Sequence, residues 1–433
     1  MNTYLPFRSH LYSVWAFLFL FIFFNSCGRK VKHPNIILIM ADDLGYECLA
    51  CNGGESYQTP ELDKMAASGV RYTNCFSQPL CTPSRVQIMT GKYNNRNYTA
   101  FGILKPGELT FAHLFKQAGY ETGIVGKWQL YGSTSAGKLK GTGTYPTEAG
   151  FDEYCLWQID QVGSRYSDPL IHWNDSIPKV FQNEYGPDVF YRFIDKFLTK
   201  NKDKPFFLYY PMALPHDPHV PTPDSKEWET DPYSKNDRFF ADMVMYMDKN
   251  VGRVVDKLSE LGLRDNTIII FTGDNGTSRR IVSRMNGEEI PGKKGIPVYY
   301  GTHVPLIING GKLVKGGVVR NNLIDFTDFV PSICGLAGID INSWQGDGKS
   351  FENSLINEKE QRNWVYCFYN SGKKHFPLAV FAQNKTYKLY EDGRLFNIEK
   401  DQAEKEMLDT ANLSSAENVN RNSLREILVN NRN

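Results

Sequence analysis

The sequence has almost no excess of charge of either sign, with 49 Lys and Arg against 48 Asp and Glu. A protein that binds nucleic acid through its phosphates needs a basic surface, so this balance argues against a nucleic-acid partner. Repeats and low-complexity tracts are also lacking, and 41% hydrophobic with 13% aromatic residues is ordinary for a globular chain. Any anionic ligand must therefore be held by a few local cations.

Apolar runs long enough to cross a membrane comfortably are lacking as well. The run Leu11–Phe24, preceded by Arg8, is too short for this and is typical of an export signal, with a short N-terminal anchor as the alternative. It ends in Phe24-Asn25-Ser26-Cys27, which resembles a loose bacterial lipobox. We expect residues 1–26 to be an export signal and Cys27 to be lipidated. The protein would then reach the periplasm or cell surface and touch the membrane only through that lipid.

Cysteine is scarce, and no group of His and Cys has the spacing of a zinc site. Besides Cys27 there are seven cysteines: Cys48, Cys51, Cys75, Cys81, Cys155, Cys334 and Cys367. Because seven is odd, at least one of them would be free or modified in an oxidising compartment.

Polar residues follow several predicted strands at the point where each strand ends. The continuous apolar run Asn35–Met40, typical of a parallel strand covered on both faces, leads directly into Asp42-Asp43. Three further segments have this layout: Thr122–Val125 before Lys127, Pro205–Tyr210 before His216, and Thr267–Thr272 before Asp274-Asn275. Helical periodicity lies between them, from about Glu61 to Gly69 and from Phe240 to Leu258. We predict a doubly wound, mostly parallel α/β sheet flanked by helices, with ligands beyond the strands' carboxyl ends.

The character of the chain changes after roughly Gly346. Short alternating runs at Ala379–Gln383, Thr386–Tyr390 and Arg394–Ile398 predict a small antiparallel sheet. Ser414 and Glu417 form a plausible capping box for a last helix that reaches Leu428. We predict a main domain over residues 34–345 and a C-terminal α+β subdomain over residues 346–433, without catalytic residues of its own.

The segment Cys81-Thr82-Pro83-Ser84-Arg85 opens a predicted short helix that Thr90-Gly91 closes. Cys81 would then lie at a helix N-terminus, where an anion is favoured. A buried or disulfide-bonded cysteine would also explain this pentapeptide alone. Cys-x-Pro-x-Arg followed by Thr-Gly resembles the formylglycine-dependent sulfatases of the alkaline-phosphatase superfamily, and the similarity continues in order from Asn35 to about Gly338.

The resemblance implies a metal site. NIILIMADDLGY and FTGDNG are similar to the family's two metal loops, so Asp42, Asp43, Asp274 and Asn275 would be ligands together with the modified Cys81. Oxygen donors with three carboxylate charges suit one Ca²⁺ ion. Either loop alone would also fit an Asx-rich turn after a strand.

The resemblance also implies a set of catalytic cations. Arg85, Lys127, His216 and Lys294 would bind the sulfate oxygens, and the histidine would protonate the departing alcohol. Fixed cations neutralise these oxygens without reorganisation as the S–O bond breaks. A maturation enzyme would oxidise Cys81 to formylglycine, whose hydrate attacks sulfur with one hydroxyl and ejects sulfate with the other.

Two positions depart from the family pattern. Gln129 stands where Gly-Lys-Trp-His-Leu has its histidine, and a glutamine cannot accept a proton near neutral pH. Either Lys127, His216 or a water takes over that role, or turnover is slow. Residues Tyr299 to His303 replace Glu-Gly-Gly-x-Arg, as subfamily variation or as loop packing only.

We predict the substrate pocket in an insertion from about Tyr154 to Asp175, where aromatic and basic side chains would stack on a sugar ring and bind another anionic group. An ordinary aromatic-rich surface loop is the alternative. The pocket candidates are Trp157, Arg165, Tyr166 and Trp173, with His219 and Lys293 at the rim.

The favoured function is hydrolysis of a sulfated carbohydrate. A phosphatase or phosphodiesterase of the same superfamily is one alternative, although the His and Asp ligands of a two-zinc site are not grouped here. A surface lipoprotein that binds sulfated glycans with a decayed active site is the other, and Gln129 alone favours it.

Overall fold

The computed structural model describes residues 1–3, 33–357, 359–372 and 376–432. His33–Asn433 group into one compact unit. Residues 4–26 of the predicted export signal, and Cys27, lie outside the described residues. Within the described ranges, no helix combines the length and the apolar character needed to cross a membrane.

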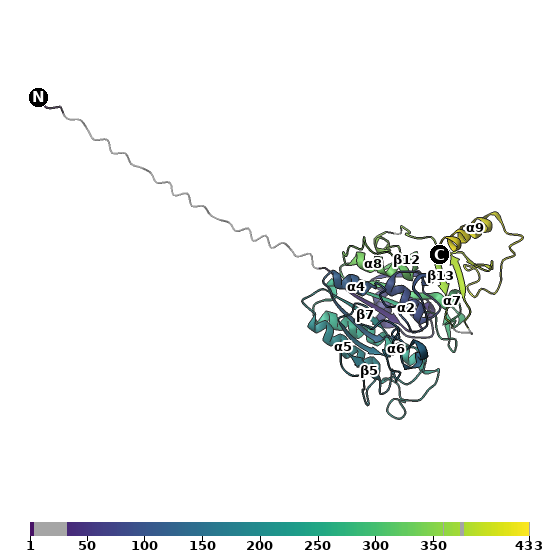
Figure 1. Cartoon of the computed structure of the whole chain (residues 1–433), viewed down its shortest axis with the longest axis horizontal. Helices are drawn as coiled ribbons and strands as arrows, with labels where there is room; N and C mark the ends of the chain where they lie inside the picture. Colours follow the sequence, from purple (N-terminus) through teal and green to yellow (C-terminus); the bar gives the residue numbers. More distant parts are fainter. Residues whose placement is uncertain (4–32, 358, 373–375, 433) are drawn as a thin grey trace. The chain divides into compact units, whose positions relative to one another are not determined.

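A ten-stranded sheet forms the centre of this unit, in the order β12-β2-β11-β8-β1-β7-β3-β4-β5-β6 (Figure 1). Its strands are β1 (Asn35–Ala41), β2 (Val70–Phe76), β3 (Glu121–Lys127), β4 (Glu153–Trp157), β5 (Leu170–Trp173), β6 (Lys179–Val180), β7 (Phe206–Pro211), β8 (Thr267–Gly273), β11 (His303–Asn309) and β12 (Val318–Asp325). The four predicted strands lie side by side as β8-β1-β7-β3, and all their pairings are parallel. The prediction of a mostly parallel sheet is confirmed, and antiparallel pairs occur only where β11, β5 and β6 join it.

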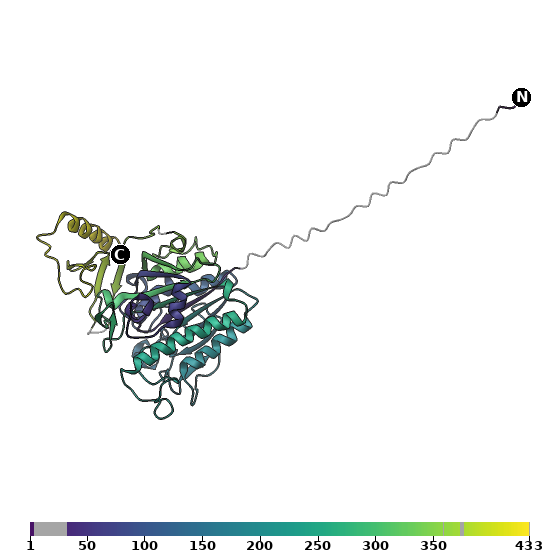
Figure 2. The same cartoon turned by 180° about the vertical axis from the view of Figure 1, so that it is seen from behind.

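Helices cover both faces of the sheet, as Figures 1 and 2 show from opposite sides. The described helices are α1 (Pro60–Ala67), α2 (Cys81–Thr90), α3 (Asn94–Asn97), α4 (Phe111–Gln117), α5 (Gly186–Lys200), α6 (Phe239–Glu260), α7 (Tyr299–Thr302), α8 (Phe329–Leu336) and α9 (Ser415–Asn430). The last of them, α9, packs on the separate C-terminal sheet. Successive residues of a strand point to opposite faces, so β1 serves both layers. Ile37 and Ile39 pack against α1, α5 and α6, whereas Ile36 and Leu38 pack with α2, α4 and α8.

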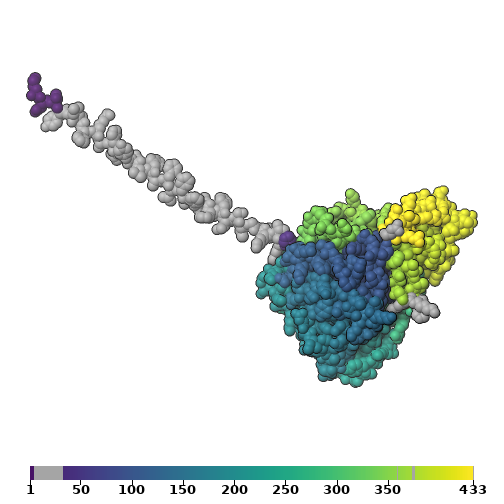
Figure 3. Space-filling view, viewed as in Figure 1, coloured from purple at the N-terminus to yellow at the C-terminus, as the bar shows by residue number. Residues whose placement is uncertain are grey.

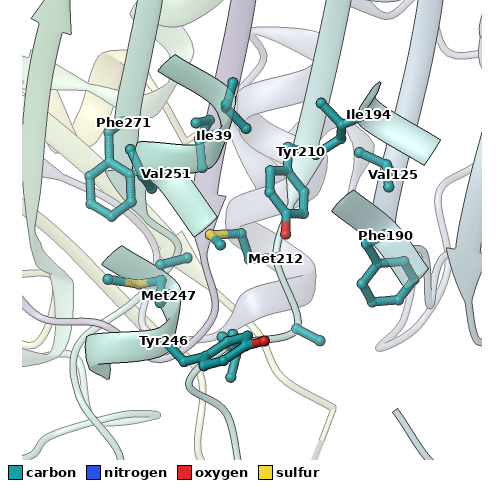
Figure 4. Close-up of a cluster of buried hydrophobic side chains, with 14 of the residues drawn as sticks. Ile39, Val125, Phe190, Ile194, Tyr210, Met212, Tyr246, Met247, Val251 and Phe271 are labelled. Atoms are coloured by element: carbon teal, nitrogen blue, oxygen red, sulfur yellow. The ribbon is translucent and has the colours of Figure 1, made fainter. Parts of the chain in front are cut away.

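The layer that contains α5 and α6 is drawn in Figure 4, where Met247 and Val251 of α6 face Ile39 and Phe271 of the sheet. Such side chains each contribute about 1.5–3 kcal/mol when fully buried. The helix ends before Gly262, whose φ of 68° is readily adopted by glycine, as the sequence predicts.

The C-terminal sheet is antiparallel and runs β13 (Val365–Tyr369), β14 (Ala379–Gln383), β15 (Tyr387–Tyr390), β16 (Leu395–Asn397). The capping box of Ser414 and Glu417 at the start of α9 is confirmed. Strand β13 escaped prediction, and it brings Tyr366 against Tyr93 of the main domain. Figure 3 shows the yellow C-terminal region lying directly against the dark blue residues of that domain.

The expected insertion from Tyr154 to Asp175 needs correction, because it contributes β4 and β5 to the main sheet. Tyr154 and Leu156 face one core layer, while Cys155 and Trp157 face the other. A strand buried on both faces has no polar alternation, so no sequence pattern indicated that this short aromatic segment forms strands of the main sheet. A separate hairpin of β9 (Val282–Met285) and β10 (Glu288–Pro291) follows the second predicted metal loop.

Candidate active site

The two predicted metal loops meet at the carboxyl edge of the sheet. Ala41 of β1 lies opposite Gly273 of β8, so the residues that follow come out side by side. The backbone amide of Asp43 donates to Asp274 Oδ1 at 3.0 Å, and Asn275 Nδ2 donates to Asp43 Oδ1 at 2.9 Å. The loops are therefore interlocked by hydrogen bonds, with Asp43 in the left-handed region at φ 67°.

The donor set at this edge fits a hard divalent cation. Asp42, Cys81 and Asp274 each offer a ligand atom within 4.8 Å of the others. Asp42 Oδ1 and Asn275 Oδ1 are buried without a hydrogen-bond partner among the described residues. Burial, followed by the charges of Asp42 and Cys81, raises the pKa of Asp274 well above its usual range. A bound cation would coordinate Asp42 Oδ1 and Asn275 Oδ1 and would reduce the repulsion between the neighbouring carboxylates.

Cys81 is the first residue of α2 and lies in the wall of a cavity of about 580 Å³. The thiol is free, as are the other six described cysteines. Every residue of α2 is buried, and Gly91 ends the helix at φ 66°. This burial fixes the position of Cys81, because the whole helix is held by the surrounding core.

Two lysines neutralise the two aspartates that follow β1. Lys127 Nζ donates to Asp42 Oδ2 at 2.7 Å, and Lys294 Nζ donates to Asp43 Oδ2 at 2.6 Å. Burial alone would raise the pKa of Asp42, but electrostatic interactions, first with His216 and then with Lys127, hold it well below its usual range. Burial opposes the charge of Lys294 as well, yet the Asp43 carboxylate keeps its pKa above the usual value. Lys294 therefore remains a cation.

His216 lies between a cation and a backbone carbonyl. Lys294 Nζ is 2.9 Å from His216 Nε2, and His216 Nδ1 is 2.7 Å from the Asp217 carbonyl oxygen. A lysine cation and a carbonyl oxygen dictate the tautomer, so Nδ1 donates and Nε2 accepts. The contact with His216 also holds the pKa of the Asp217 carboxyl well below its usual range.

The cavity gathers residues from distant parts of the sequence. Five predicted site residues line it: Cys81, Gln129, Arg165, His216 and Lys294. Arg85 and Lys127 lie behind the wall, where Arg85 Nη2 donates to the Lys127 carbonyl at 3.0 Å. Sequence reasoning missed Leu80, Phe101, Asp217, Ser278, Arg279, Arg280 and Phe376. Of these, Ser278 to Arg280 lie two to four residues after the FTGDNG loop, and that position was the available signal.

The profile of one protein family, described as Sulfatase, matches residues 34–339. The chain belongs to the sulfatase family. Arylsulfatase J of Mus musculus is 30% identical over 334 residues, covering 71% of this chain and 53% of that protein. The chain thus spans about half the length of this relative. N-acetylglucosamine-6-O-sulfatase of Bacteroides thetaiotaomicron is 24% identical over 491 residues, covering 89% of this chain and 82% of that protein.

Solved structures share the fold as well. Ps i-CgsB in complex with k-i-k-neocarrahexaose superposes with a TM-score of 0.74 at 25% identity. The superposition covers 92% of this chain and 94% of that one. Sulfatases are sulfuric ester hydrolases.

The predicted substrate residues do not all reach this cavity. Trp157 and Tyr166 are buried and line a neighbouring cavity of about 460 Å³, which shares Arg165 with the first. Trp173 lies elsewhere, because it faces the core layer of α5 and packs on Phe193 with ring centroids 5.6 Å apart.

The two rim candidates also lie outside the active-site cavity. His219 is buried, with Nδ1 2.8 Å from Asp237 Oδ1. Lys293 lines a third cavity, together with residues of β10 such as Glu288. The next residue along the chain, Lys294, lines the active-site cavity instead.

The two departures from the family pattern have different positions. Gln129, at φ 45°, lines the active-site cavity. His303 is buried and stacks on Tyr46 with ring centroids 4.1 Å apart, which fits the interpretation that this segment packs the loop.

Proposed function

We propose that this chain releases sulfate from a sulfated carbohydrate, using formylglycine made from Cys81 and one calcium ion. One arrangement carries the proposal. Cys81 opens a buried helix in the wall of the cavity, within 4.8 Å of two carboxylates, and Lys294 and His216 line the same cavity. The saccharide substrate is supported by the names of two similar proteins, an N-acetylglucosamine-6-O-sulfatase and a structure that holds an oligosaccharide.

Asp42, Asp43, Asp274 and Asn275 would hold the calcium ion. Bound calcium would supply charge stabilisation at the reacting oxygens, and the aldehyde hydrate made from Cys81 would supply the nucleophilic hydroxyl. Lys127 and Lys294 keep the site from carrying a large excess of negative charge, since each is paired with one aspartate. A site of three acids and two lysines accepts both a cation and a sulfate group.

The leaving group needs one proton. When the bond between sulfur and the sugar oxygen breaks, that oxygen keeps the electron pair and must be protonated to leave as an alcohol. The His216–Lys294 pair holds a proton between Nε2 and Nζ, 2.9 Å apart, at the cavity surface. We assign the acid role to this pair.

The same pair would act as the base in the second step, in which the other hydroxyl of the formylglycine hydrate loses its proton and sulfate is ejected. Gln129 lines the cavity but cannot accept a proton, and Lys127 is buried and held by Asp42. After giving up a proton to the alcohol, the His216–Lys294 pair at the cavity surface can accept one. A neutral Gln129 is then compatible with turnover.

The first test is mass spectrometry of the Cys81 peptide from protein produced together with a formylglycine-generating enzyme. We expect an aldehyde in place of the thiol, followed by sulfate release from at least one member of a panel of sulfated saccharides. Cys81→Ala should abolish release, whereas Cys51→Ala, at a half-buried cysteine outside the cavity, should not.

Metal analysis of the same protein separates the alternatives. One calcium per chain supports the proposal, and two zinc ions per chain would favour a phosphatase or phosphodiesterase instead. An unmodified Cys81, while a control sulfatase matures in the same cells, would favour a glycan-binding protein without turnover.

We further propose export to the periplasm or cell surface with a lipid on Cys27. The apolar run and the lipobox-like end of residues 1–26 support this. Mass spectrometry of the mature N-terminus should find a lipid-modified Cys27 and no preceding residues. A chain that keeps residues 1–26 in the membrane fraction would support the short-anchor alternative.

A further inference from the structure

Arg165 reaches the active-site cavity from the segment between β4 and β5. Its guanidinium carbon lies 3.9 Å from the centre of the Trp157 ring. Trp157 belongs to β4, is buried, and donates from Nε1 to the Gly163 carbonyl at 2.8 Å. The guanidinium plane therefore rests on an aromatic side chain that is itself held in place, which orients its N–H groups before any ligand binds.

The guanidinium group of Arg165 is also largely buried. Arg165 Nη1 is 3.9 Å from Asp42 Oδ2, which is too long for a hydrogen bond. Lys127 already donates to that oxygen at 2.7 Å. Nη1 is buried and has no hydrogen-bond partner among the described residues, so it is a cationic donor left unused at the depth of the predicted metal ligands.

The other arginines near the cavity are engaged differently. Arg280 pairs with Asp237 at 3.0 Å, and Arg279 lies over the Phe376 ring; both are exposed. Arg85 is buried behind the wall and does not line the cavity. Among the arginines that the structure describes, Arg165 alone combines a place in the cavity wall with a buried, unused donor.

We propose that Arg165 binds an oxygen of the substrate's sulfate group, in the part of the cavity wall that also contains His216 and Lys294. Its planar fork suits the spacing of two sulfate oxygens, and the absence of a competing hydrogen bond leaves Nη1 available. The inference rests on the proposed function, because it needs sulfate to bind beside Cys81. Gln129 adds no charge to this wall, so Arg165 supplies part of the positive field around the sulfate.

Isothermal titration of inorganic sulfate into the calcium-loaded protein tests this directly. Arg165→Gln should weaken sulfate binding by about tenfold, the size of one charge-assisted hydrogen bond. Arg165→Lys should recover part of the loss, because it keeps the charge but not the fork. Arg192→Gln, at an exposed arginine that pairs with Glu184 on the surface, should bind sulfate like the unmodified chain.

The thermal midpoint and the calcium affinity of Arg165→Gln should stay close to those of the unmodified chain, which a role as counter-ion of Asp42 would not allow. Unchanged sulfate binding by Arg165→Gln would overturn this inference and leave the proposed function intact. Failure of the unmodified chain to bind sulfate at all would overturn both.

Discussion

His303 should make the folded protein sensitive to mild acid. The side chain is buried between Tyr46 and Phe76, and Nε2 donates to the Thr73 carbonyl at 2.9 Å. Burial disfavours the charged ring and lowers the pKa of His303 to about 4. Between pH 6.5 and 4 the unfolded chain binds the proton and the folded chain does not. Stability is therefore present above pH 6.5 and is lost as the pH falls through this window.

The size of the loss follows from the two pKa values. A gap of about 2.5 units corresponds to about 3 kcal/mol once the pH is below 4, and about 2 kcal/mol of this is already lost at pH 5. Urea unfolding followed by tryptophan fluorescence at pH 7 and pH 5 measures it. His303→Gln keeps a donor for the Thr73 carbonyl but cannot take up a proton, so it should lose about 2 kcal/mol less than the unmodified chain over this interval.

His33→Gln is the matched control, because His33 is exposed and its replacement should leave the pH dependence unchanged. Carboxylates that titrate in the same window are common to all three proteins and cancel in the comparison. Equal losses for His303→Gln and the unmodified chain would refute the reasoning.

Three further perturbations test the candidate active site and the stability of the fold around it. Lys127→Met should lower the free energy of unfolding by about 3–5 kcal/mol in urea titrations, because it leaves the buried Asp42 carboxylate without its 2.7 Å partner. Removing calcium with EGTA should lower the thermal midpoint, since an ion present at a hundredfold its Kd adds about 2.7 kcal/mol to the folded state. Asp248→Ala should cost about 1 kcal/mol, and Asp248→Asn less, because Asp248 accepts the amides of Glu61 and Leu62 at the start of α1.

Each of these has a clear contrary result. Lys127→Met with unchanged stability would mean that Asp42 does not depend on this lysine. A thermal midpoint that is insensitive to both EGTA and added calcium would count against the metal site. Equal stability of Asp248→Ala and the unmodified chain would show that the hydrogen bonds from the start of α1 to Asp248 contribute little to stability.

The central strands and α2, the helix that begins at Cys81, could be predicted because their sequence signals are local. β1 and β8 are continuous apolar runs, and each ends directly before paired polar residues. Parallel strands bring their carboxyl ends to one edge, so Asp42 and Asp274 had to lie close together once the strands paired. The helix from Cys81 to Thr90 was visible from Pro83 and Gly91 for the same reason.

Other features depend on contacts that no local pattern encodes. β4 carries aromatic residues toward both layers, so it lacked the alternation of a half-buried strand. Phe376 reaches the active-site cavity from the C-terminal region, for which only the absence of catalytic residues was predicted. Trp173 was a reasonable candidate by residue type, but its place in β5 turns it toward α5.

The sequence by itself determined the family, the sheet, the acid pairs and the position of Cys81, because strand and helix periods and short motifs act over a few residues. Only the tertiary structure decided which cations line the cavity beside Cys81. Lys127 and Lys294 look alike in the sequence, yet one is buried behind Asp42 and the other lines the cavity with His216. Arg165 gained its place through packing on Trp157, a contact that exists only after β4 has joined the sheet.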